Sequence, residues 1–329
     1  MYRLNLNKIL VILGVIAVIM VAVFLTWFYK RDITISNKQE AKKSVITGLE
    51  CENATRRPVA VMLAGDKEAR PLSAISQADL VVEMLAAPNG ITRFMAVYQC
   101  EEPKEIGSVR SARDGFTDLA GSFDAIFAHW GGERGALERL DGQVIDNIDA
   151  MKYEGATYYR KKGIRQPHNG FTSFELLWGK AKELKYRLDN KFAGYPHKEG
   201  AGAKNLANLV DNIKINYPDP FGSEWKYDTK TNDYARYRDG KKETDASGGE
   251  VRAGVVIVMK TISAPLRDQY VDVEVYGEGE AQIYQNEISI SGKWKKDRTS
   301  ISSKLYFYDF SGKEIEFAPG KIWIEIVAM

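Results

Sequence analysis

Two arginines stand three positions apart in the segment 107–113, directly ahead of an expected helix. Arg110 and Arg113 flank Ser111, and an apolar helical pattern follows them. Ser111 is a good N-cap residue with an acidic residue three positions later, so the pattern predicts a helix that begins at Ser111. A helix N-terminus carries about half a positive charge, so two cations there are unfavourable unless negative charge offsets them. An anionic ligand would make this a binding site, whereas a buried carboxylate such as Glu83 would make it a structural ion pair.

Two of the three histidines lie at expected element boundaries. His129 ends an apolar strand at residues 124–129 and precedes Gly131 and Gly132, after which a helical run begins at residue 133. Ligands of α/β sheets gather beyond the carboxyl ends of strands, and a glycine pair ahead of a helix lets backbone N–H groups approach an anion. The alternative is a histidine hydrogen-bonded in a β–α turn, with glycines needed only for the bend.

His168 and Asn169 precede a second expected helix. That helix is predicted to begin at Thr172, where Glu175 completes a capping box. The basic residues at 160–165 alone are typical of a solvated face. Together with His168 and Asn169, they would place a second helix N-terminus beside the same anion.

Glu83 lies among apolar residues of an expected strand, where an unpaired carboxylate is expensive to bury. Arg93 lies on the next expected strand, beyond a turn at residues 88–90, and the two are expected close enough in register to pair or to line one face. An ion pair and acid–base chemistry therefore both remain open for Glu83. The candidate acid–base residues are His129, His168 and Glu83, and the candidate ligand-binding residues are Arg93, Arg110, Ser111, Arg113, Gly131, Gly132 and Asn169.

Metal and nucleophile chemistry are poorly supported by the residue pattern. The two histidines would need a carboxylate supplied by the fold to hold a metal ion. Neither cysteine stands in a nucleophile context, and the chain contains no G-x-S-x-G motif. We expect neither a metal nor a cofactor.

The first 31 residues predict a membrane anchor. Residues 9–28 are almost entirely apolar, and a helix of that length crosses roughly 30 Å of hydrocarbon. Bulky aromatic residues and then Lys30 and Arg31 follow, whereas a cleaved signal peptide has a shorter apolar stretch and small residues at its cleavage site. We expect a retained single-pass helix with the C-terminal bulk outside the cytoplasm. Cys51 and Cys100 are then expected to form a disulfide, the alternative being two unrelated buried thiols.

The charge balance argues against a nucleic-acid partner. Lys and Arg number 46 against 44 Asp and Glu, and removing residues 1–31 leaves 42 basic residues against the same 44 acidic ones. The remaining chain lacks the global positive footprint of a nucleic-acid binder, so any positive potential must be local.

The chain divides into four expected segments. Residues 1–31 are the anchor and 32–55 a polar stalk, while 56–198 alternate strand and helix signals, which predicts an α/β domain with a mixed sheet. From 204 to 329, short segments rich in β-branched and aromatic residues predict a β-rich sandwich or barrel. The strands expected there lie at residues 224–227, 234–237, 255–259, 270–276, 281–284, 305–308 and 322–327.

These motifs together resemble the YerB-like lipoprotein family, bacterial two-domain proteins of unknown function. The matching stretches are residues 57–62, 70–71, 76–79, Glu83, 90–94, 106–107, 109–113, His129 with Gly131 and Gly132, 167–169, 292–296, 319–320 and 323–325. The resemblance implies an extracytoplasmic, membrane-tethered protein and brings no reaction with it. The chain departs from the family pattern in its transmembrane anchor, and in Asp114 and Phe171 where the family would have proline and tyrosine.

We therefore expect a protein of the cell membrane that binds a phosphate- or carboxylate-bearing component of the cell envelope in a His/Arg pocket. The first alternative is a hydrolase or transferase that acts on such a ligand. The second is a structural interaction module, in which the arginines pair with Glu83 and Asp79.

Overall fold

The chain forms two compact units. The computed structural model describes residues 6–36, 42–198, 209–267 and 269–328. The first unit, Met1–Ala41, is built on the helix α1 (Leu6–Ser36), and the second unit, Lys42–Met329, contains the other described elements.

Helix α1 is long and apolar enough to cross a membrane. Its stretch Leu10–Phe28 has 19 residues, a mean hydropathy of 2.9 and no buried residues. At 1.5 Å per residue this stretch is about 28 Å long, close to the thickness of the hydrocarbon core. A signal sequence meets the same criteria of length and composition, so the retained anchor stays a prediction.

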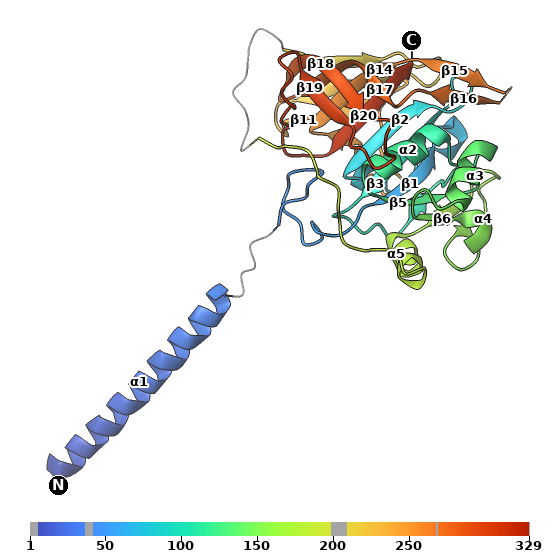
Figure 1. The fold of residues 1–329 in the computed structure, drawn as a ribbon. Helices are drawn as coiled ribbons and strands as arrows, with labels where there is room; N and C mark the ends of the chain where they lie inside the picture. Colours follow the sequence, from blue (N-terminus) through green and yellow to red (C-terminus); the bar gives the residue numbers. More distant parts are fainter. Residues whose placement is uncertain (1–5, 37–41, 199–208, 268, 329) are drawn as a thin grey trace. The chain divides into compact units, whose positions relative to one another are not determined.

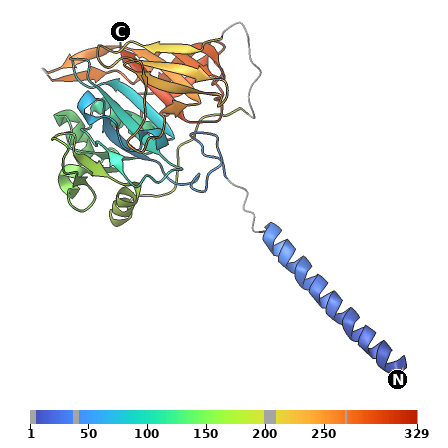
Figure 2. The same ribbon diagram turned by 180° about the vertical axis from the view of Figure 1, so that it is seen from behind.

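A mixed sheet of ten strands runs through the second unit. Figures 1 and 2 show it passing from the C-terminal strands, in orange and red, to the N-terminal strands, in blue and cyan. Strand β2 pairs in parallel with β20, so the two expected domains contribute to one sheet. In order across the sheet the strands are β19 (Tyr306–Asp309), β18 (Ile288–Lys296), β17 (Gly277–Gln285), β14 (Val255–Thr261), β20 (Ile322–Ala328), β2 (Leu80–Leu85), β3 (Thr92–Tyr98), β1 (Val59–Ala64), β5 (Ile126–His129) and β6 (Asn147–Asp149).

Smaller sheets and short helices complete the second unit. A five-stranded sheet contains β9 (Asn212–Ile215), β10 (Ser223–Asp228), β11 (Asp233–Arg238), β12 (Lys241–Lys242) and β13 (Arg252–Ala253). The remaining strands are β4 (Ile106–Gly107), β7 (Tyr159–Arg160), β8 (Gly170–Thr172), β15 (Ser263–Leu266) and β16 (Tyr270–Val273). The helices are α2 (Asp114–Ser122), α3 (Arg134–Asp141), α4 (Ala150–Tyr153) and α5 (Phe174–Glu183), with 3-10 turns at Lys67–Ala69 and Ile75–Gln77.

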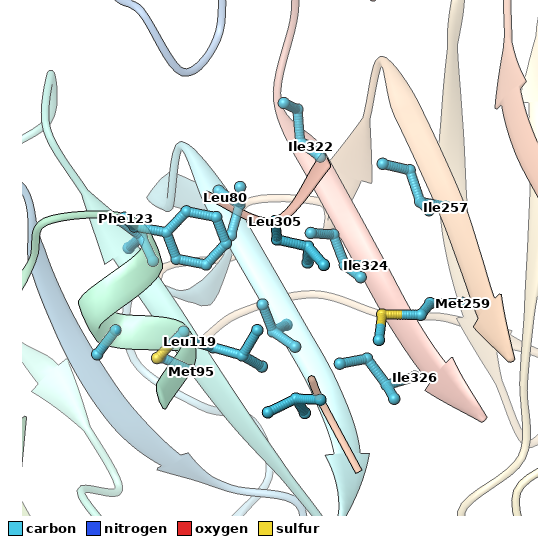
Figure 3. Close-up of a cluster of buried hydrophobic side chains, with 14 of the residues drawn as sticks. Leu80, Met95, Leu119, Phe123, Ile257, Met259, Leu305, Ile322, Ile324 and Ile326 are labelled. Atoms are coloured by element: carbon cyan, nitrogen blue, oxygen red, sulfur yellow. The ribbon is translucent and has the colours of Figure 1, made fainter. Parts of the chain in front are cut away.

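Both faces of the central strands of the large sheet are buried. On one face, Leu119 and Phe123 of α2 pack against Leu80, Met95 and Ile324 of the central strands (Figure 3). On the other face, a second buried cluster contains side chains of β2, β3 and β20 together with side chains of the five-stranded sheet, and α5 contacts β6. Because the central strands are covered on both sides, their sequences are continuous apolar runs and do not alternate between apolar and polar residues.

The mixed α/β class and the β-rich C-terminal part are confirmed, and most expected strands are present. The β2–β3 hairpin lies where the turn at residues 88–90 predicted it, and six of the seven expected C-terminal segments coincide closely with strands of the structure. In the seventh, 270–276, β16 ends at Val273. Strands β9, β12, β13, β15 and β18 were not expected. The longest of them, β18, alternates between buried and exposed residues toward its end and has few β-branched side chains there. The boundaries 56–198 and 204–329 stay predictions.

Two predicted helix starts are wrong. Helix α2 begins at Asp114, and its N-cap residue is Arg113 rather than Ser111. The backbone of Arg110 and Ala112 is hydrogen-bonded to β1 and to the loop after β5, which keeps this segment extended. Helix α5 is capped by Ser173, whose side chain accepts from the backbone N–H of Leu176, because Thr172 is still part of β8.

The N-terminal part of the second unit is tied down covalently. Cys51 and Cys100 form a disulfide with a Cα–Cα distance of 5.8 Å, as expected. Ile46 is fully buried, and the Ser44 hydroxyl donates to the Gln99 side chain. This part of the expected stalk therefore packs on the sheet.

Candidate functional site

Glu83 and Arg93 lie on opposite faces of the β2–β3 hairpin. In the register of the hairpin, Glu83 stands opposite Phe94, and Arg93 stands opposite Met84. Because successive side chains of a strand point to opposite faces, a one-residue offset separates the two charges by the thickness of the sheet. The expectation that they pair or line one face is wrong.

Glu83 belongs to a buried charge cluster beneath the five-stranded sheet. We name Glu83, Glu325, Glu243, Arg236 and Arg238 the inter-sheet charge cluster. Glu83 accepts hydrogen bonds from Arg236, from Arg238 at 3.2 Å and from the Thr92 hydroxyl at 2.7 Å. Arg236 also pairs with Glu243, so each of its nearest charges is of opposite sign.

The partners of Glu83 give it a structural role. Its side chain and that of Arg236 have no exposed surface, and the two bind β2 of the N-terminal part to β11 of the C-terminal part. Burial alone would lower the pKa of Arg236, but Glu243, Glu83 and Glu325 raise it above its usual value. The charges are compensated within the protein, which leaves this carboxylate no free partner for acid–base chemistry.

The arginines of the sequence motif meet on the α2 face, at the carboxyl end of β1. We name Arg93, Arg110, Arg113 and His168 the strand-end cationic cluster. Arg93 pairs with Ala64, the last residue of β1, and the backbone N–H of Arg110 donates to Met62 of the same strand. Arg113 follows as the N-cap residue of α2. Three chain segments therefore bring their cations to one end of the sheet.

Among the residues that the structure describes, Asp66 is the one carboxylate that contacts the cationic cluster. Its Oδ2 accepts from Arg93 Nη1 at 2.8 Å and lies 3.6 Å from Arg110 Nη2. The next carboxylate that affects Arg113 is Glu133, whose side chain accepts from the backbone N–H of Ala136 and caps α3. Two carboxylates, Asp66 and Glu133, thus face three guanidinium groups, and of the two only Asp66 is close enough to form an ion pair with them.

The guanidinium groups retain unused donors. The Arg110 side chain is 13 % exposed, and it donates no hydrogen bond to any residue that the structure describes. Arg113 donates only to the Ala112 carbonyl, at 2.8 Å, and its guanidinium lies 4.7 Å from the centre of the Tyr270 ring. Buried polar groups are almost always hydrogen-bonded in native proteins, so donors without a partner are exceptional.

The pKa values of these arginines are consistent with an excess of positive over negative charge in the cluster. Burial and the positive charges of Arg110 and Arg113 together lower the pKa of Arg93 to about 9, against the opposing effect of Asp66. Burial also lowers the pKa values of Arg110 and Arg113. An anion placed beside these groups would relieve both the desolvation and the mutual repulsion.

His168 joins the cluster and Asn169 stays beside it. Burial lowers the pKa of His168, and the positive charge of Arg110 lowers it further. The buried Nδ1 atom of His168 has no hydrogen-bond partner among the described residues. Asn169 instead accepts from Arg160 Nη1 at 3.1 Å, which holds the loop ahead of β8.

His129 and the glycine pair form a buried turn. His129 has no exposed surface, and its Nδ1 and Nε2 lie 2.8 Å from the Gly131 carbonyl and 3.3 Å from Asn147 Oδ1. The backbone N–H of Gly131 donates to Asp149 at 2.8 Å, and Gly132 forms a bridge with Ala112. These contacts match the alternative of a histidine hydrogen-bonded in a β–α turn.

The structure adds two residues that the sequence analysis did not single out. Asp66 follows β1 in a loop and resembles any surface acid in the sequence, and Tyr270 comes from the distant β16. Ser111 makes no side-chain contact in the cationic cluster. No group of three or more potential metal ligands lies close together among the residues described.

Comparisons with known proteins place the chain in a family. Residues 46–187 match the N-terminal domain of a protein of unknown function, DUF3048, and residues 213–324 match its C-terminal domain. The chain is a DUF3048 protein. It is 33 % identical over 303 residues to the "Putative lipoprotein YerB" of Bacillus subtilis (strain 168), covering 87 % of this chain and 86 % of that one.

The fold of this DUF3048 protein is also known from a relative. A crystal structure of the YerB protein from Bacillus subtilis matches with a TM-score of 0.78 and 30 % identity, over 88 % of this chain and 97 % of that chain. The resemblance to the YerB-like family is thereby confirmed, together with the fold class.

Proposed function

We propose that this DUF3048 protein is a membrane-anchored, extracytoplasmic receptor for an anionic, phosphate- or carboxylate-bearing component of the cell envelope. The ligand binds at the strand-end cationic cluster. The observation that carries the proposal is the mostly buried Arg110 guanidinium, which has no hydrogen bond to any described residue and only a 3.6 Å contact with one carboxylate. Placing such a group out of water is unfavourable unless a ligand supplies the missing acceptors.

The anchor and the disulfide support the proposed location. The relative carries the name of a lipoprotein, which points to the outer side of a cell membrane. Both cysteines of this chain form the disulfide, so neither is free to carry a lipid, and α1 takes the place of the lipid anchor. Disulfides persist in oxidising, extracytoplasmic compartments.

The enzyme alternative rests on His168. Among the histidines proposed for acid–base work, His129 has both ring nitrogens engaged, whereas His168 has a buried nitrogen without a partner and adjoins the arginines. The ion pairs with Glu83 and Asp79 that the structural alternative assumed are not formed, because Glu83 binds Arg236 and Asp79 accepts from the backbone N–H groups of Gln99 and Cys100. A structural interaction module without a small-molecule site stays an alternative prediction.

A sulfate titration tests the proposal. The full chain in phospholipid nanodiscs is titrated with sodium sulfate, and its thermal unfolding is compared with that in sodium chloride of equal ionic strength. We expect sulfate to raise the unfolding temperature beyond the effect of salt screening, by mass action on the folded state. Arg110→Gln is expected to weaken sulfate binding about tenfold, the effect of losing one charge-assisted contact.

Arg134→Gln is the matched control, because Arg134 is 73 % exposed and pairs only with Glu138 on α3. The control should bind sulfate as the unchanged chain does. Equal responses to sulfate and chloride, or equal losses in both variants, would refute an anion site at the cationic cluster.

A further inference from the structure

A pair of stacked tyrosines lies at the other end of the large sheet, on its edge strand β19. The rings of Tyr306 and Tyr308 lie 5.5 Å apart between centres and 15° apart in plane. The ammonium of Lys304 lies 4.7 Å from the centre of the Tyr306 ring. Tyr306 thus contacts both a tyrosine ring and an ammonium group, whereas Tyr308 has no second aromatic or cationic contact among the described residues.

The two tyrosines line a cavity of about 490 Å³ on the outer face of the sheet. Lys293 and Lys295 of β18 stand opposite Tyr308 and Tyr306, and Glu278 of β17 stands opposite Lys295. None of these three charged residues forms an ion pair within the parts of the chain that the structure describes. The cavity therefore presents free donors and a free acceptor beside an aromatic face, which is the usual make-up of a ligand pocket.

An exposed aromatic residue extends the cavity beyond the strand. Phe310 is 72 % exposed in the turn that follows β19, and it lines the same cavity. The Asp309 side chain accepts from the backbone N–H groups of Ser311 and Lys313, which fixes the turn and holds Phe310 outward. A large apolar side chain held in water at the rim of a cavity favours a ligand with an apolar face.

From this geometry we propose that the cavity binds a neutral carbohydrate chain. A sugar ring offers a C–H face for Tyr308 and Phe310, and its hydroxyl groups need donors and acceptors together, which Lys293, Lys295 and Glu278 supply. Polyanions are disfavoured, because Glu278, Asp297 and Asp309 line the same cavity as the lysines.

An extended peptide fits this edge less well than a sugar chain does. Strand addition requires a free row of backbone groups on an edge strand. On β19 the backbone N–H of Asp309 donates to Lys313, and the backbone N–H of Ile315 donates to Phe307. The segment after the turn therefore already covers the outer side of the strand.

Isothermal titration of the full chain tests the proposal. The chain is held in phospholipid nanodiscs without sugar-headed detergents, and the probes are tetramers of N-acetylglucosamine and of glucose. We expect one or both tetramers to bind, and we expect Tyr308→Ala to weaken binding by about tenfold through loss of the stacking face. Tyr308→Phe keeps the ring and should keep the affinity.

Tyr237→Ala is the matched control, since Tyr237 is a half-buried strand tyrosine of the five-stranded sheet whose ring packs on Lys226. Its affinity for the tetramers should be unchanged. If Tyr308→Ala unfolds the chain, the Lys293→Gln variant tests the proposal instead, because Lys293 is exposed and its replacement should leave the fold intact. This variant should also weaken binding of the tetramers. Failure of both sugars to bind, unchanged binding in Tyr308→Ala or Lys293→Gln, or tighter binding of a tetralysine peptide would each overturn the proposal.

Discussion

The β2–β3 hairpin carries one charged residue on each face, and the two faces differ in how completely that charge is paired with residues of opposite sign. Beneath the five-stranded sheet, Glu83 is completely buried with arginines of the C-terminal part. On the α2 face, Arg93 lies beside two further arginines, and Asp66 is the one carboxylate among the described residues that pairs with it. Charge is compensated inside the protein on the first face and left in excess on the second.

The difference separates a structural role from a binding role. A buried ion pair that is complete in the protein joins two parts of a fold, and removing one partner leaves an unpaired charge out of water. The cationic cluster at the strand ends is incompletely paired, and it is there that we propose an anion binds. Mutations should therefore affect stability on the first face and anion affinity on the second.

The largest effect is expected for Arg236→Met in the inter-sheet charge cluster. Glu83 and Glu243 would lose their main cationic partner while staying buried. We expect a loss of about 3–5 kcal/mol in the free energy of unfolding, measured by denaturant titration, with the sulfate affinity of the surviving folded chain unchanged. A loss below 1 kcal/mol in the free energy of unfolding would show that the inter-sheet charge cluster does not have the structural role that distinguishes it from the cationic cluster.

The pH dependence of stability should come largely from Glu325 of the same cluster. Burial and the neighbouring Glu83 raise the pKa of Glu325 from 4.5 to about 8. Between these pH values the folded chain holds a proton that the unfolded chain has released, so stability is present at low pH and is lost as the pH rises toward 8.

Glu325→Gln should flatten this dependence, because a neutral amide keeps the acceptor for the indole N–H of Trp225. In the unchanged chain we expect the unfolding temperature to fall by several degrees between pH 5 and 8, and in the variant by much less. Parallel curves for the two proteins would show that Glu325 does not titrate in this range.

Asp66→Asn tests the imbalance on the α2 face. Arg93 would lose its carboxylate partner, so we expect a loss of about 1–2 kcal/mol in the free energy of unfolding. The sulfate affinity should rise several-fold, because the positive charge of the cluster is no longer offset. A fall in sulfate affinity in this variant would mean that Asp66 positions the arginines rather than competing with the anion.

The smallest effect is expected from His168. Its pKa is lowered below 6.5, first by burial and then by Arg110, so it is neutral at pH 7 and gains a proton only as the pH falls further. Sulfate keeps its charge over this range, so we expect its affinity to rise a few-fold from pH 7 to pH 5 in the unchanged chain. His168→Gln should remove that rise, and its persistence would place His168 outside the site.

Local sequence patterns predicted the helices and strands well, but they predicted poorly which charged side chains pair with one another. The apolar runs and turn residues placed β1, β2, β3 and most C-terminal strands, since strand periodicity and turn chemistry act over a few residues. The same patterns failed at Ser111, because backbone hydrogen bonds from β1 and from the loop after β5 hold residues 110–112 extended. Long-range pairing there overrode a local capping signal.

The sequence by itself determined the apolar helix, the strand and helix content, and the concentration of cations at residues 110–113. These features depend on composition and on short spacing. Only the tertiary structure decided which carboxylate meets which arginine. A one-residue offset in the register of β2 and β3 sends Glu83 to one face and Arg93 to the other, and the partners on each face come from segments far away in the chain. Arg236 and Asp66 could be assigned to opposite faces only once the strands were paired.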